Sequence, residues 1–364
     1  MLEDLRSELN DLDRQLVDLI ARRQAVVQRI GATKRDTGTA TRDYGREKVV
    51  LELARKNAES QGISPKLAET VMTMLIEGSL QAQEKDRLVH ASSGSNQRAL
   101  VFGGCGKMGR WFADFLASQS FAVDIVDPSD VGSRHARVDR WQDVVDQYDL
   151  LVVAAPIKVS AELLRELLPL KPRGTIFDLA SLKSPLRQPL RALADAGCSV
   201  TSVHPMFGPD THLLSGRHVI FCDVGVASAT EHAVSLFANT MAEKVEMSLE
   251  DHDRMVGYVL GLSHALNIAF FTALRESGEA SNVLADLSST TFDAQLAIAR
   301  AVAGEHPPMY FEIQHLNDYG RAPLSALADA LSRIRELVER GDEAGFVQLM
   351  EKGHQYLVST SKEP

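Results

Sequence analysis

The chain has 364 residues, of which 45% are hydrophobic and 24% charged, an ordinary composition for a globular protein of two or three domains. Its formal net charge of −10 argues against nucleic acid as a partner, so an anionic substrate would need local arginines. Three scattered cysteines are typical of neither a disulfide framework nor a zinc site. Since we find neither a signal peptide nor an apolar run of membrane-spanning length, we expect a cytoplasmic protein with no metal and no membrane partner.

The first 89 residues are predicted to be helical. Leucines recur along the first helix at alternating steps of four and three, a seam suited to packing against another long helix. A second helix is expected after TRDYG, and a third is expected to start with Ser64 as N-cap and Pro65 in the first turn. Small polar residues at 90–98 indicate a linker. The leucine seam comprises Leu5, Leu9, Leu12, Leu16 and Leu19.

The pattern changes after the linker. Short β-rich runs alternate with helical stretches over residues 99–248, which favours a mostly parallel, doubly wound sheet of the Rossmann type. No strand is predicted from 249 to 364. Residues 253–274 form a long apolar helix that is hydrophobic on more than one face, so we expect it to be buried in a subunit interface or a domain core. The fold class is therefore multidomain, with α and α/β parts.

A glycine-rich turn opens the sheet region. Gly104, Gly106 and Gly109 fit G-x-G-x-x-G, where the first allows a tight turn, the second lets backbone approach a pyrophosphate, and the third allows close helix–strand packing. Asp127 ends the next strand about twenty residues on, where a ribose-binding carboxylate is expected. A carboxylate there would repel a 2′-phosphate, which favours NAD over NADP. The alternative is a glycine turn in some other α/β domain. The predicted cofactor site comprises Gly104, Gly106, Lys107, Met108, Gly109, Asp127, Ala155 and Pro156.

A histidine marks a second position on the sheet. The segment SVHPMFGPD places His204 at the carboxyl end of a strand, where open α/β sheets bind ligands. Pro205 and Pro209 stiffen this segment, and Gly208 allows a turn. A histidine at this place can take a hydroxyl proton while hydride leaves the same carbon. A structural histidine at a strand end fits the position equally well.

The motifs HPMFGPD, DLASLKS and VFGGCGKMG together resemble the prephenate dehydrogenase family. The resemblance implies oxidation and decarboxylation of prephenate with NAD, on a nucleotide-binding domain followed by a helical dimerisation domain. It implies that His204 hydrogen-bonds the ring hydroxyl and assists hydride transfer. Ser181 and Lys183 would lie near the substrate and the nicotinamide, and Ser263 and His264 of GLSHALN match a second substrate-side motif.

Two positions depart from the family pattern. Asn267 stands where many members carry a further histidine, a change that we do not interpret as inactivating because fused members vary there. Prephenate carries two carboxylates and requires a buried arginine. Arg300 is the candidate, but Ala301 occupies the expected position, and one residue is about 100° of helix rotation. Either the GEH loop carries an inserted residue, or the carboxylate grip differs and Arg300 is a solvated arginine. These departures leave room for arogenate or 4-amino-4-deoxyprephenate as the substrate.

Polar residues interrupt the apolar seams of the front helices. Arg23 falls where the first seam would carry leucine, and Lys34 continues the same row. On the third helix, Ser79 and Gln83 continue the apolar stripe. Cations and amides directed into a helical core are costly unless an anion binds there. The pattern therefore predicts a polar pocket within a helical bundle.

The spacing over nearly all of residues 2–88 resembles the all-helical chorismate mutase family. The resemblance implies a dimer with swapped long helices, in which Arg6 reaches the partner's pocket and the arginines hold the carboxylates of chorismate. Lys34 and Gln83 would stabilise the breaking ether oxygen, and Glu47 and Asp43 would grip the ring hydroxyl or set neighbouring side chains. The alternative is a helical dimerisation arm with scattered charges. The matching motif residues are Arg6, Arg23, Lys34, Asp43, Arg46, Glu47, Ser79 and Gln83.

The two resemblances together imply one enzyme with two successive activities toward tyrosine, of which the first makes prephenate and the second oxidises it. The predicted division is a mutase domain at 1–89, a linker at 90–98, an NAD-binding domain at 99–248, and a helical dimerisation and substrate domain at 249–364. A homodimer is expected, and inhibition by tyrosine is a hypothesis from pathway position. The alternative is a regulatory protein with one inactive domain.

Overall fold

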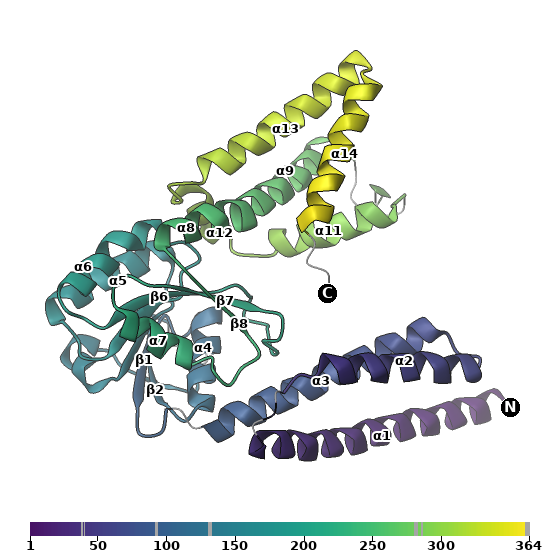
Figure 1. The fold of residues 1–364 in the computed structure, drawn as a ribbon, viewed down its shortest axis with the longest axis horizontal. Helices are drawn as coiled ribbons and strands as arrows, with labels where there is room; N and C mark the ends of the chain where they lie inside the picture. Colours follow the sequence, from purple (N-terminus) through teal and green to yellow (C-terminus); the bar gives the residue numbers. More distant parts are fainter. Residues whose placement is uncertain are drawn as a thin grey trace. The chain divides into compact units, whose positions relative to one another are not determined.

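The structure is a computed structural model that describes residues 1–37, 39, 41–91, 94–129, 133–279, 283–284 and 287–360 (Figure 1). The chain divides into two compact units. The first comprises Met1–Ala180 and Gln188–Ser248, and the second comprises Ser181–Arg187 and Leu249–Pro364. Two residues of the predicted linker, Ser92 and Ser93, lie outside the described residues.

Three helices begin the first unit: α1 (Leu2–Asp36), α2 (Tyr44–Ser60) and α3 (Pro65–Ala91). Helix α2 starts slightly before its predicted start, because the carboxylate of Asp43 accepts a hydrogen bond from the backbone N–H of Arg46 (2.9 Å) and caps it. Helix α3 starts at Pro65 as predicted. All three helices predicted in this segment are therefore present.

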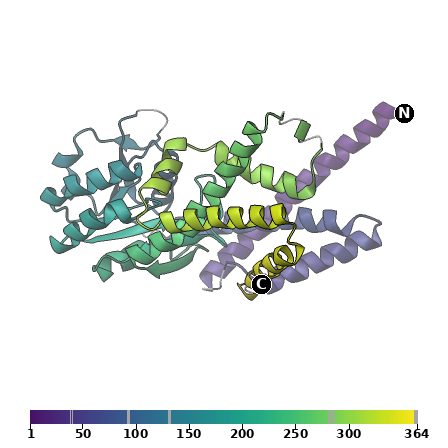
Figure 2. The same cartoon turned by 90° about the horizontal axis from the view of Figure 1, so that it is seen from above.

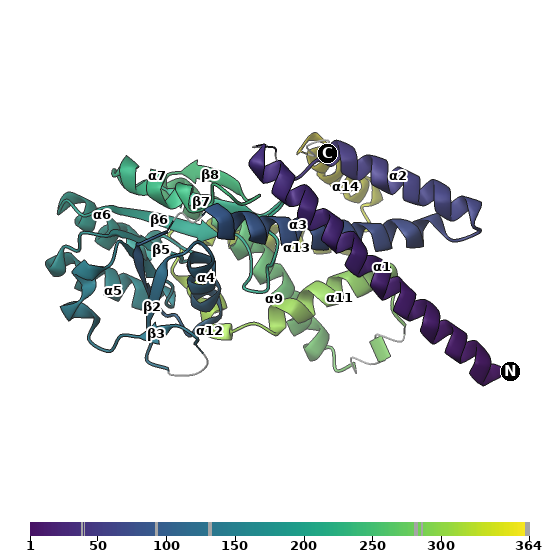
Figure 3. The same ribbon diagram turned by 90° about the horizontal axis from the view of Figure 1, so that it is seen from below.

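The leucine seam of α1 is open in the single chain. Val27 is the only buried residue of this helix. The five seam leucines remain 55–57% exposed, and the N-terminal half of α1 runs clear of α2 and α3 (Figure 3). A long apolar stripe left in water is unfavourable and typically marks a surface that another helix covers.

An eight-stranded sheet forms the rest of the first unit, in the order β3-β2-β1-β4-β5-β6-β7-β8. Its neighbouring strands are parallel except for the antiparallel pair β6–β7. The two-residue strand β3 was not predicted, because so short a run has no readable periodicity. The strands are β1 (Arg98–Phe102), β2 (Ala122–Val126), β3 (Ala136–Arg137), β4 (Leu150–Val153), β5 (Thr175–Asp178), β6 (Val200–Pro205), β7 (His218–Cys222) and β8 (Glu243–Met247).

Helices lie on both faces of this sheet (Figure 2). From β1 the chain turns to β2 on one side, and from β4 it turns to β5 on the other, so right-handed crossovers place their helices on opposite faces. The reversal between β1 and β4 is the topological switch point, where open α/β sheets bind ligands. The helices are α4 (Lys107–Ser118), α5 (Ile157–Leu170), α6 (Arg187–Asp195) and α7 (Ala227–Ser235).

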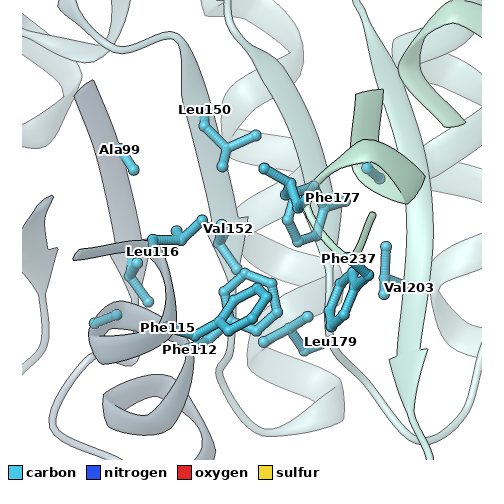
Figure 4. Packing of buried hydrophobic residues seen from close by; sticks show 14 of the residues in the cluster. Ala99, Phe112, Phe115, Leu116, Leu150, Val152, Phe177, Leu179, Val203 and Phe237 are labelled. Atoms are coloured by element: carbon cyan, nitrogen blue, oxygen red, sulfur yellow. The ribbon is translucent and has the colours of Figure 1, made fainter. Parts of the chain in front are cut away.

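An aromatic cluster fills the core between this sheet and its helices (Figure 4). The ring of Phe112 on α4 meets Phe177 of β5 edge to face with centroids 5.6 Å apart, and Phe115 stacks on Phe237 at 4.9 Å. Phe112, Phe177 and Phe237 are completely buried. The amphipathic pattern of α4 therefore anchors the start of this helix, and with it the glycine turn, to the sheet.

The second unit contains helices and no strand among its described residues, as predicted. The long helix predicted at 253–274 is present, with a π-helical turn that separates α8 from α9. Two side chains satisfy the backbone at this turn, because Ser263 Oγ donates to the Val259 carbonyl (2.7 Å) and Gln314 Nε2 donates to the Gly261 carbonyl (2.7 Å). The elements are α8 (Leu249–Val256), η4 (Gly257–Leu262), α9 (Ser263–Glu276), α11 (Thr290–Ala303), α12 (Pro307–His315), α13 (Arg321–Arg340) and α14 (Glu343–Thr360).

The α8–η4–α9 run is apolar but mostly open in the single chain. Residues Leu249–Glu276 have a stretch of mean hydropathy 1.4, of which only 22% is buried. By length and composition this helix could cross a membrane, so the statement that no apolar run approaches that length is wrong; the core helix of a soluble protein passes the same test. Tyr258, Val259 and Leu266 are 43–55% exposed, so the expected burial is not achieved within one chain.

Candidate active sites

The glycine turn follows β1 and leads into α4. The left-handed residue is Gly103 (φ +78°), one position before the glycine that was expected to make the tight turn. A Cβ at Gly109 would lie 2.1 Å from the Gly103 carbonyl oxygen, and a Cβ at Gly104 would lie 2.5 Å from Ile125. Only glycine therefore allows helix, turn and strand to approach this closely, as the pattern predicted for Gly109.

Asp127 lies just after β2 and reaches this turn. Its carboxylate accepts hydrogen bonds from the backbone N–H of Cys105 and from that of Ser129, both at 2.9 Å. The acid predicted to bind a ribose is thus held beside the turn predicted to bind a pyrophosphate. Asp127 is far from the glycine turn in sequence, but the parallel pairing of β1 with β2 brings the two together.

The turn and its surroundings fit a dinucleotide. Gly106 is the N-cap of α4 and has no side chain to cap the first backbone N–H groups, and such groups at a helix N-terminus can bind an anion. The end of β4 adjoins the turn, because a Cβ on Gly103 would lie 2.6 Å from the Ala154 carbonyl oxygen. Ala155 and Pro156 follow directly. Of the other predicted contacts, Lys107 is exposed and Met108 packs against the core.

His204 lies on β6 and is only 4% exposed. It stands opposite Ile220 in the antiparallel pair with β7, near the carboxyl end of its strand, as predicted. Two residues earlier on the same face, Ser202 Oγ donates to the carboxylate of Asp178 (2.5 Å), which also accepts from the Ala180 N–H (2.9 Å). Ser202 and Asp178 were not identified as site residues from the sequence, although each lies within a predicted strand.

The loop that follows His204 is anchored to the cofactor-binding part of the sheet. The Met206 N–H donates to the His218 carbonyl (2.9 Å), and Trp111 of α4 donates from Nε1 to the Thr211 carbonyl (2.9 Å). The Trp111 ring also meets Phe207 at 5.0 Å. The loop at 206–217 is therefore fixed to the helix that begins at the glycine turn.

In the second unit, a buried acid holds the segment that carries Ser181 and Lys183. Asp253 accepts hydrogen bonds from the Lys183 N–H (2.8 Å) and His252 Nδ1 (2.8 Å), and from the N–H and Oγ of Ser184. Burial by itself would raise the pKa of Asp253, but the hydrogen bonds from His252 and Ser184 outweigh it and lower that pKa. Lys183 is fully buried. Asp253 could not be identified from the sequence, because the segment that it holds lies about 70 residues away.

The GLSHALN motif lies at the start of α9. Ser263 uses its hydroxyl on the π-helical turn, and the ring of His264 lies 4.3 Å from that of Tyr310. Burial lowers the pKa of His264, and its Nδ1 has no partner among the described residues. Asn267 is 6% exposed and bridges helices, donating to the Ser263 carbonyl (2.8 Å) and accepting from Gln295 (2.9 Å). Asn267 thus serves packing in this chain.

Arg300 lies in the last turn of α11 and is exposed. Its neighbour Ala299 is the buried residue of this helix, so Arg300 points away from the packed face. Within one chain, Arg300 is therefore not a buried arginine of the kind expected to bind a substrate carboxylate. Its proposed role stays a prediction.

In the front bundle, Arg23 is already positioned by α3. Its Nη1 donates to the Leu75 carbonyl (2.9 Å) and to Ser79 Oγ (2.5 Å), and Ser79 is 5% exposed. The structure therefore brings together two of the predicted pocket residues from different helices. One cation is held at the α1–α3 seam where leucine was expected.

Lys34 and Gln83 lie farther along the same seam. Lys34 Nζ donates to the Thr41 carbonyl (2.8 Å), in the segment between α1 and α2. Gln83 packs on Gly31 so closely that a Cβ at Gly31 would lie 2.9 Å from Gln83 Cγ. The Oε1 atom of Gln83 is buried without a hydrogen-bond partner among the described residues. A buried polar atom left unpaired is costly and is often explained by a ligand.

The acidic pocket residues are less enclosed. Glu47 forms a two-pronged ion pair with Arg42, whose Nε and Nη2 each lie 3.0 Å from a carboxylate oxygen. Asp43 is exposed and serves as the α2 cap, and Arg46 is also exposed. Arg6 lies exposed on the free half of α1. A hollow of about 450 Å³ on α1 includes Lys34 but none of the other predicted residues.

The two parts define a class of protein. A glycine turn, a carboxylate after β2 and a histidine on β6 are the parts of a dinucleotide-dependent oxidoreductase, joined here to a helical bundle with a polar seam. No group of three or more side chains able to hold a metal ion is found within the described ranges.

Comparison with known proteins identifies the family. Family models match chorismate mutase type II at residues 5–84, the prephenate dehydrogenase nucleotide-binding domain at 124–246, and its dimerization domain at 248–352. The T-protein of Enterobacter agglomerans is 26% identical over 99% of this chain and 94% of its own length. The 4-amino-4-deoxyprephenate dehydrogenase of Streptomyces pristinaespiralis is 31% identical over 69% of this chain and 88% of its own. The chain belongs to the prephenate dehydrogenase family and carries a chorismate mutase domain in front.

A solved structure confirms the fold of the dehydrogenase part. The chain superimposes on prephenate dehydrogenase of Aquifex aeolicus, crystallised with hydroxyphenyl propionate and NAD+, with a TM-score of 0.57 and 19% identity. The match covers 74% of this chain and 100% of that one. The helical, Rossmann-type and helical parts predicted from the sequence are therefore confirmed as the fold class.

Proposed function

We propose that this chain catalyses two successive reactions: the rearrangement of chorismate to prephenate, and the NAD-dependent oxidative decarboxylation of prephenate to 4-hydroxyphenylpyruvate. The observation that carries this proposal is the order of the matched families along one chain, a mutase segment followed by both dehydrogenase segments. Relatives named T-protein match that whole order over nearly the full length. A regulatory protein with an inactive domain would not need the motif residues of both halves.

In the mutase reaction, the bundle binds a dianion and stabilises charge. Arg23 is held by α3 through two hydrogen bonds, so it can receive a carboxylate with little reorganisation. Gln83 of α3 packs on Gly31 of α1, three residues before Lys34, and the side chains of Lys34 and Gln83 would stabilise the negative charge that builds on the breaking ether oxygen. The rearrangement needs no nucleophile or proton shuttle. Binding the compact reactive conformer supplies the rest of the rate enhancement.

The mutase pocket is completed by a second chain in this proposal. The open leucine seam of α1 would be covered by the same helix of a partner, and that pairing would bring Arg6 to the partner's pocket. The exposed apolar side chains of α8–α9 would form a second contact between the same kind of chains. We therefore propose a homodimer, in agreement with the dimerization domain that the family model names.

In the dehydrogenase reaction, the glycine turn and Asp127 would hold NAD, which accepts a hydride from the substrate when it is bound. His204 takes the proton of the ring hydroxyl as hydride leaves the same carbon. Loss of carbon dioxide then restores aromaticity and makes the step irreversible. Asp253 positions the backbone of Lys183 and Ser184, and Ser263 and His264 would contribute from α9. Arg300 keeps its proposed role as a carboxylate ligand.

Prephenate is favoured over its amino analogues as substrate. The relative named for 4-amino-4-deoxyprephenate matches 69% of this chain, whereas the T-proteins match 96–99% of it, including the mutase segment. A mutase in the same chain supplies prephenate directly. Turnover of prephenate, arogenate and 4-amino-4-deoxyprephenate measured side by side tests this choice, and we expect prephenate to have the highest kcat/KM.

One assay tests the whole proposal. Purified protein, chorismate and NAD are combined, NADH is followed by absorbance, and the product is identified by chromatography. NADH together with 4-hydroxyphenylpyruvate supports both activities, whereas chorismate loss without NADH would leave only the mutase. The same assay with added tyrosine tests our further proposal that tyrosine inhibits this enzyme, which we place in the cytoplasm.

A further inference from the structure

A buried carboxylate joins the mutase bundle to the dehydrogenase sheet within the first unit. Glu84 follows Gln83 on α3 and is only 3% exposed. Its Oε2 accepts a hydrogen bond from the Leu214 N–H (2.9 Å), and its Oε1 accepts from the Met241 N–H (2.6 Å). Both donors belong to loops of the sheet region, one before β7 and one before β8. Both carboxylate oxygens of Glu84 therefore accept hydrogen bonds from the sheet region.

This carboxylate is a costly choice for a purely structural contact. No ion pair to Glu84 is present among the described residues, so its charge is balanced by backbone N–H groups alone. Burial raises its pKa, against the opposing effect of these two hydrogen bonds. A buried charge without a counter-charge costs more than an apolar residue of similar size. The arrangement fixes the direction of the side chain, and hence of α3, in a way that an apolar contact would not.

A second contact reaches the same loop from the segment between α1 and α2. Arg42, which holds Glu47 with two hydrogen bonds, also donates from Nη1 to the hydroxyl of Ser215. Leu214 thus contacts α3 through Glu84, and Ser215 contacts Arg42, which lies just before α2 and pairs with Glu47 of that helix. Two neighbouring loop residues are therefore linked to two of the three helices that carry predicted pocket residues.

The loop itself is firmly placed. It leaves β6 just after His204, is held by Trp111 at the Thr211 carbonyl, and returns to the sheet at β7. The sheet core behind Trp111 is buried in one chain. The loop can therefore serve as a rigid support for the less enclosed mutase helices.

We propose that Glu84 and Ser215 are positioning residues for the mutase reaction, by which the loop at 206–217 of the dehydrogenase domain sets Gln83 and Glu47 in the mutase pocket. This inference rests on the proposed roles of Gln83 and Glu47. It means that the mutase of this chain depends on its dehydrogenase domain as a scaffold, even when no NAD turnover takes place.

Full-length variants test the proposal. Glu84→Gln keeps the size of the side chain but replaces one acceptor oxygen with an amino group that faces a backbone N–H. Ser215→Ala removes the hydroxyl that Arg42 contacts, and Ser215→Thr retains one. Glu52→Gln makes the same chemical change at an exposed carboxylate of α2 and is the matched control. Gln83→Ala reports on the pocket itself.

We expect Glu84→Gln to lower the mutase kcat about tenfold or more with a smaller change in KM, because Gln83 acts on the transition state and small displacements there are costly. Ser215→Ala should lower the mutase kcat in the same direction, although Ser215 belongs to the dehydrogenase domain. Ser215→Thr and Glu52→Gln should keep the normal value. Oxidation of supplied prephenate should remain within about threefold in all four variants and reports that the sheet domain is folded.

Different results overturn different parts of the account. A normal mutase kcat in both Glu84→Gln and Ser215→Ala, with an inactive Gln83→Ala, would overturn the positioning proposal while the pocket assignment stands. A normal mutase in Gln83→Ala would instead show that the pocket is misassigned, and the proposal would fall with it. If Glu84→Gln does not fold, the pair Ser215→Ala and Ser215→Thr decides the question.

Discussion

The sheet region and the front bundle differ in how much of their interior one chain supplies. Around the sheet, the aromatic rings of Phe112, Phe177 and Phe237 are completely buried, and the glycine turn is attached to that core by α4. In the bundle, the first helix buries only Val27 and leaves its leucine seam open. In a single chain, therefore, the core of the sheet region is buried, whereas the leucine seam of the bundle stays exposed to solvent.

This difference in packing predicts which substitutions should affect the dehydrogenase activity and which should affect the mutase activity. A dinucleotide site built from strand ends inherits its geometry from a sheet that is already packed. The geometry of a pocket on a helix seam depends on the parts that pack against that seam. Here a loop of the sheet region contacts the bundle, and we propose that a partner helix covers the leucine seam. The two activities should therefore respond differently to substitutions at these surfaces.

The largest expected effect is at the histidine of β6. His204→Asn keeps a polar side chain of similar size but removes the group that takes the hydroxyl proton. NADH formation from prephenate should fall by about 10²–10⁴-fold, while loss of chorismate proceeds at the normal rate. Stopped assays of each reaction on the same preparation measure both values. Equal rates of NADH formation in variant and parent would show that His204 has another role.

The second largest effect is expected at the leucine seam of α1. Leu12→Glu combined with Leu16→Glu places two charges in the α1 seam, which prevents its pairing with a second helix. The mutase rate should fall by about 100-fold, and oxidation of supplied prephenate should stay within about threefold of the parent value. Gln15→Glu, on an exposed part of the same helix, is the control. Retention of full mutase activity in the double variant would mean that the seam is not part of the site.

A smaller effect is expected where Gln83 packs on α1. Gly31→Ala places a methyl group 2.9 Å from Gln83 Cγ, so the side chain must shift. We expect the mutase kcat to fall about tenfold, although alanine favours a helix over glycine by about 1 kcal/mol. Gly78→Ala, whose added carbon would lie 3.6 Å from the nearest neighbouring atom, Nε2 of Gln24, is the matched control. An unchanged mutase kcat in Gly31→Ala would show that Gln83 is not part of the mutase pocket.

The smallest effect concerns stability in acid. The lowered pKa of Asp253 means that its hydrogen bonds stabilise the folded protein fully above the ordinary carboxyl pKa. That contribution is lost as the pH falls through the lower pKa of the folded state. Melting curves from about pH 5 down to about pH 2 should show a shallower pH dependence for Asp253→Asn than for the parent. Parallel slopes would mean that Asp253 titrates alike in the folded and unfolded chain.

Local patterns predicted much of this molecule. The strand–turn–helix sequence around Gly104–Gly109 and the acid after the next strand are separated by regular elements, so their spacing in sequence translates directly into proximity. Ser79 and Gln83 were found in the same way, because residues four apart share a helix face. The pattern assigned the tight turn to Gly104, whereas in the structure its neighbour Gly103 takes the left-handed conformation.

Contacts between distant backbone groups left no signal in the sequence. Glu84 meets backbone N–H groups 130 and 157 residues away, and any residue type could supply those donors. Asp253 holds its segment across about 70 residues for the same reason. For Arg300, the single-residue offset read from the sequence corresponds to an exposed position beside a buried Ala299.

The central claim, a mutase site shared by two chains beside a sheet domain complete in one, is tested most directly by mixing two inactive variants. Arg6→Ala and Arg23→Ala chains are expressed separately and also co-expressed with different tags. Each variant alone should lack mutase activity, because every pocket misses one arginine. Co-expression should restore about a quarter of the parent rate, since half of the dimers are mixed and each holds one intact pocket. No recovery in isolated mixed dimers would contradict the shared site and place the whole pocket within one chain.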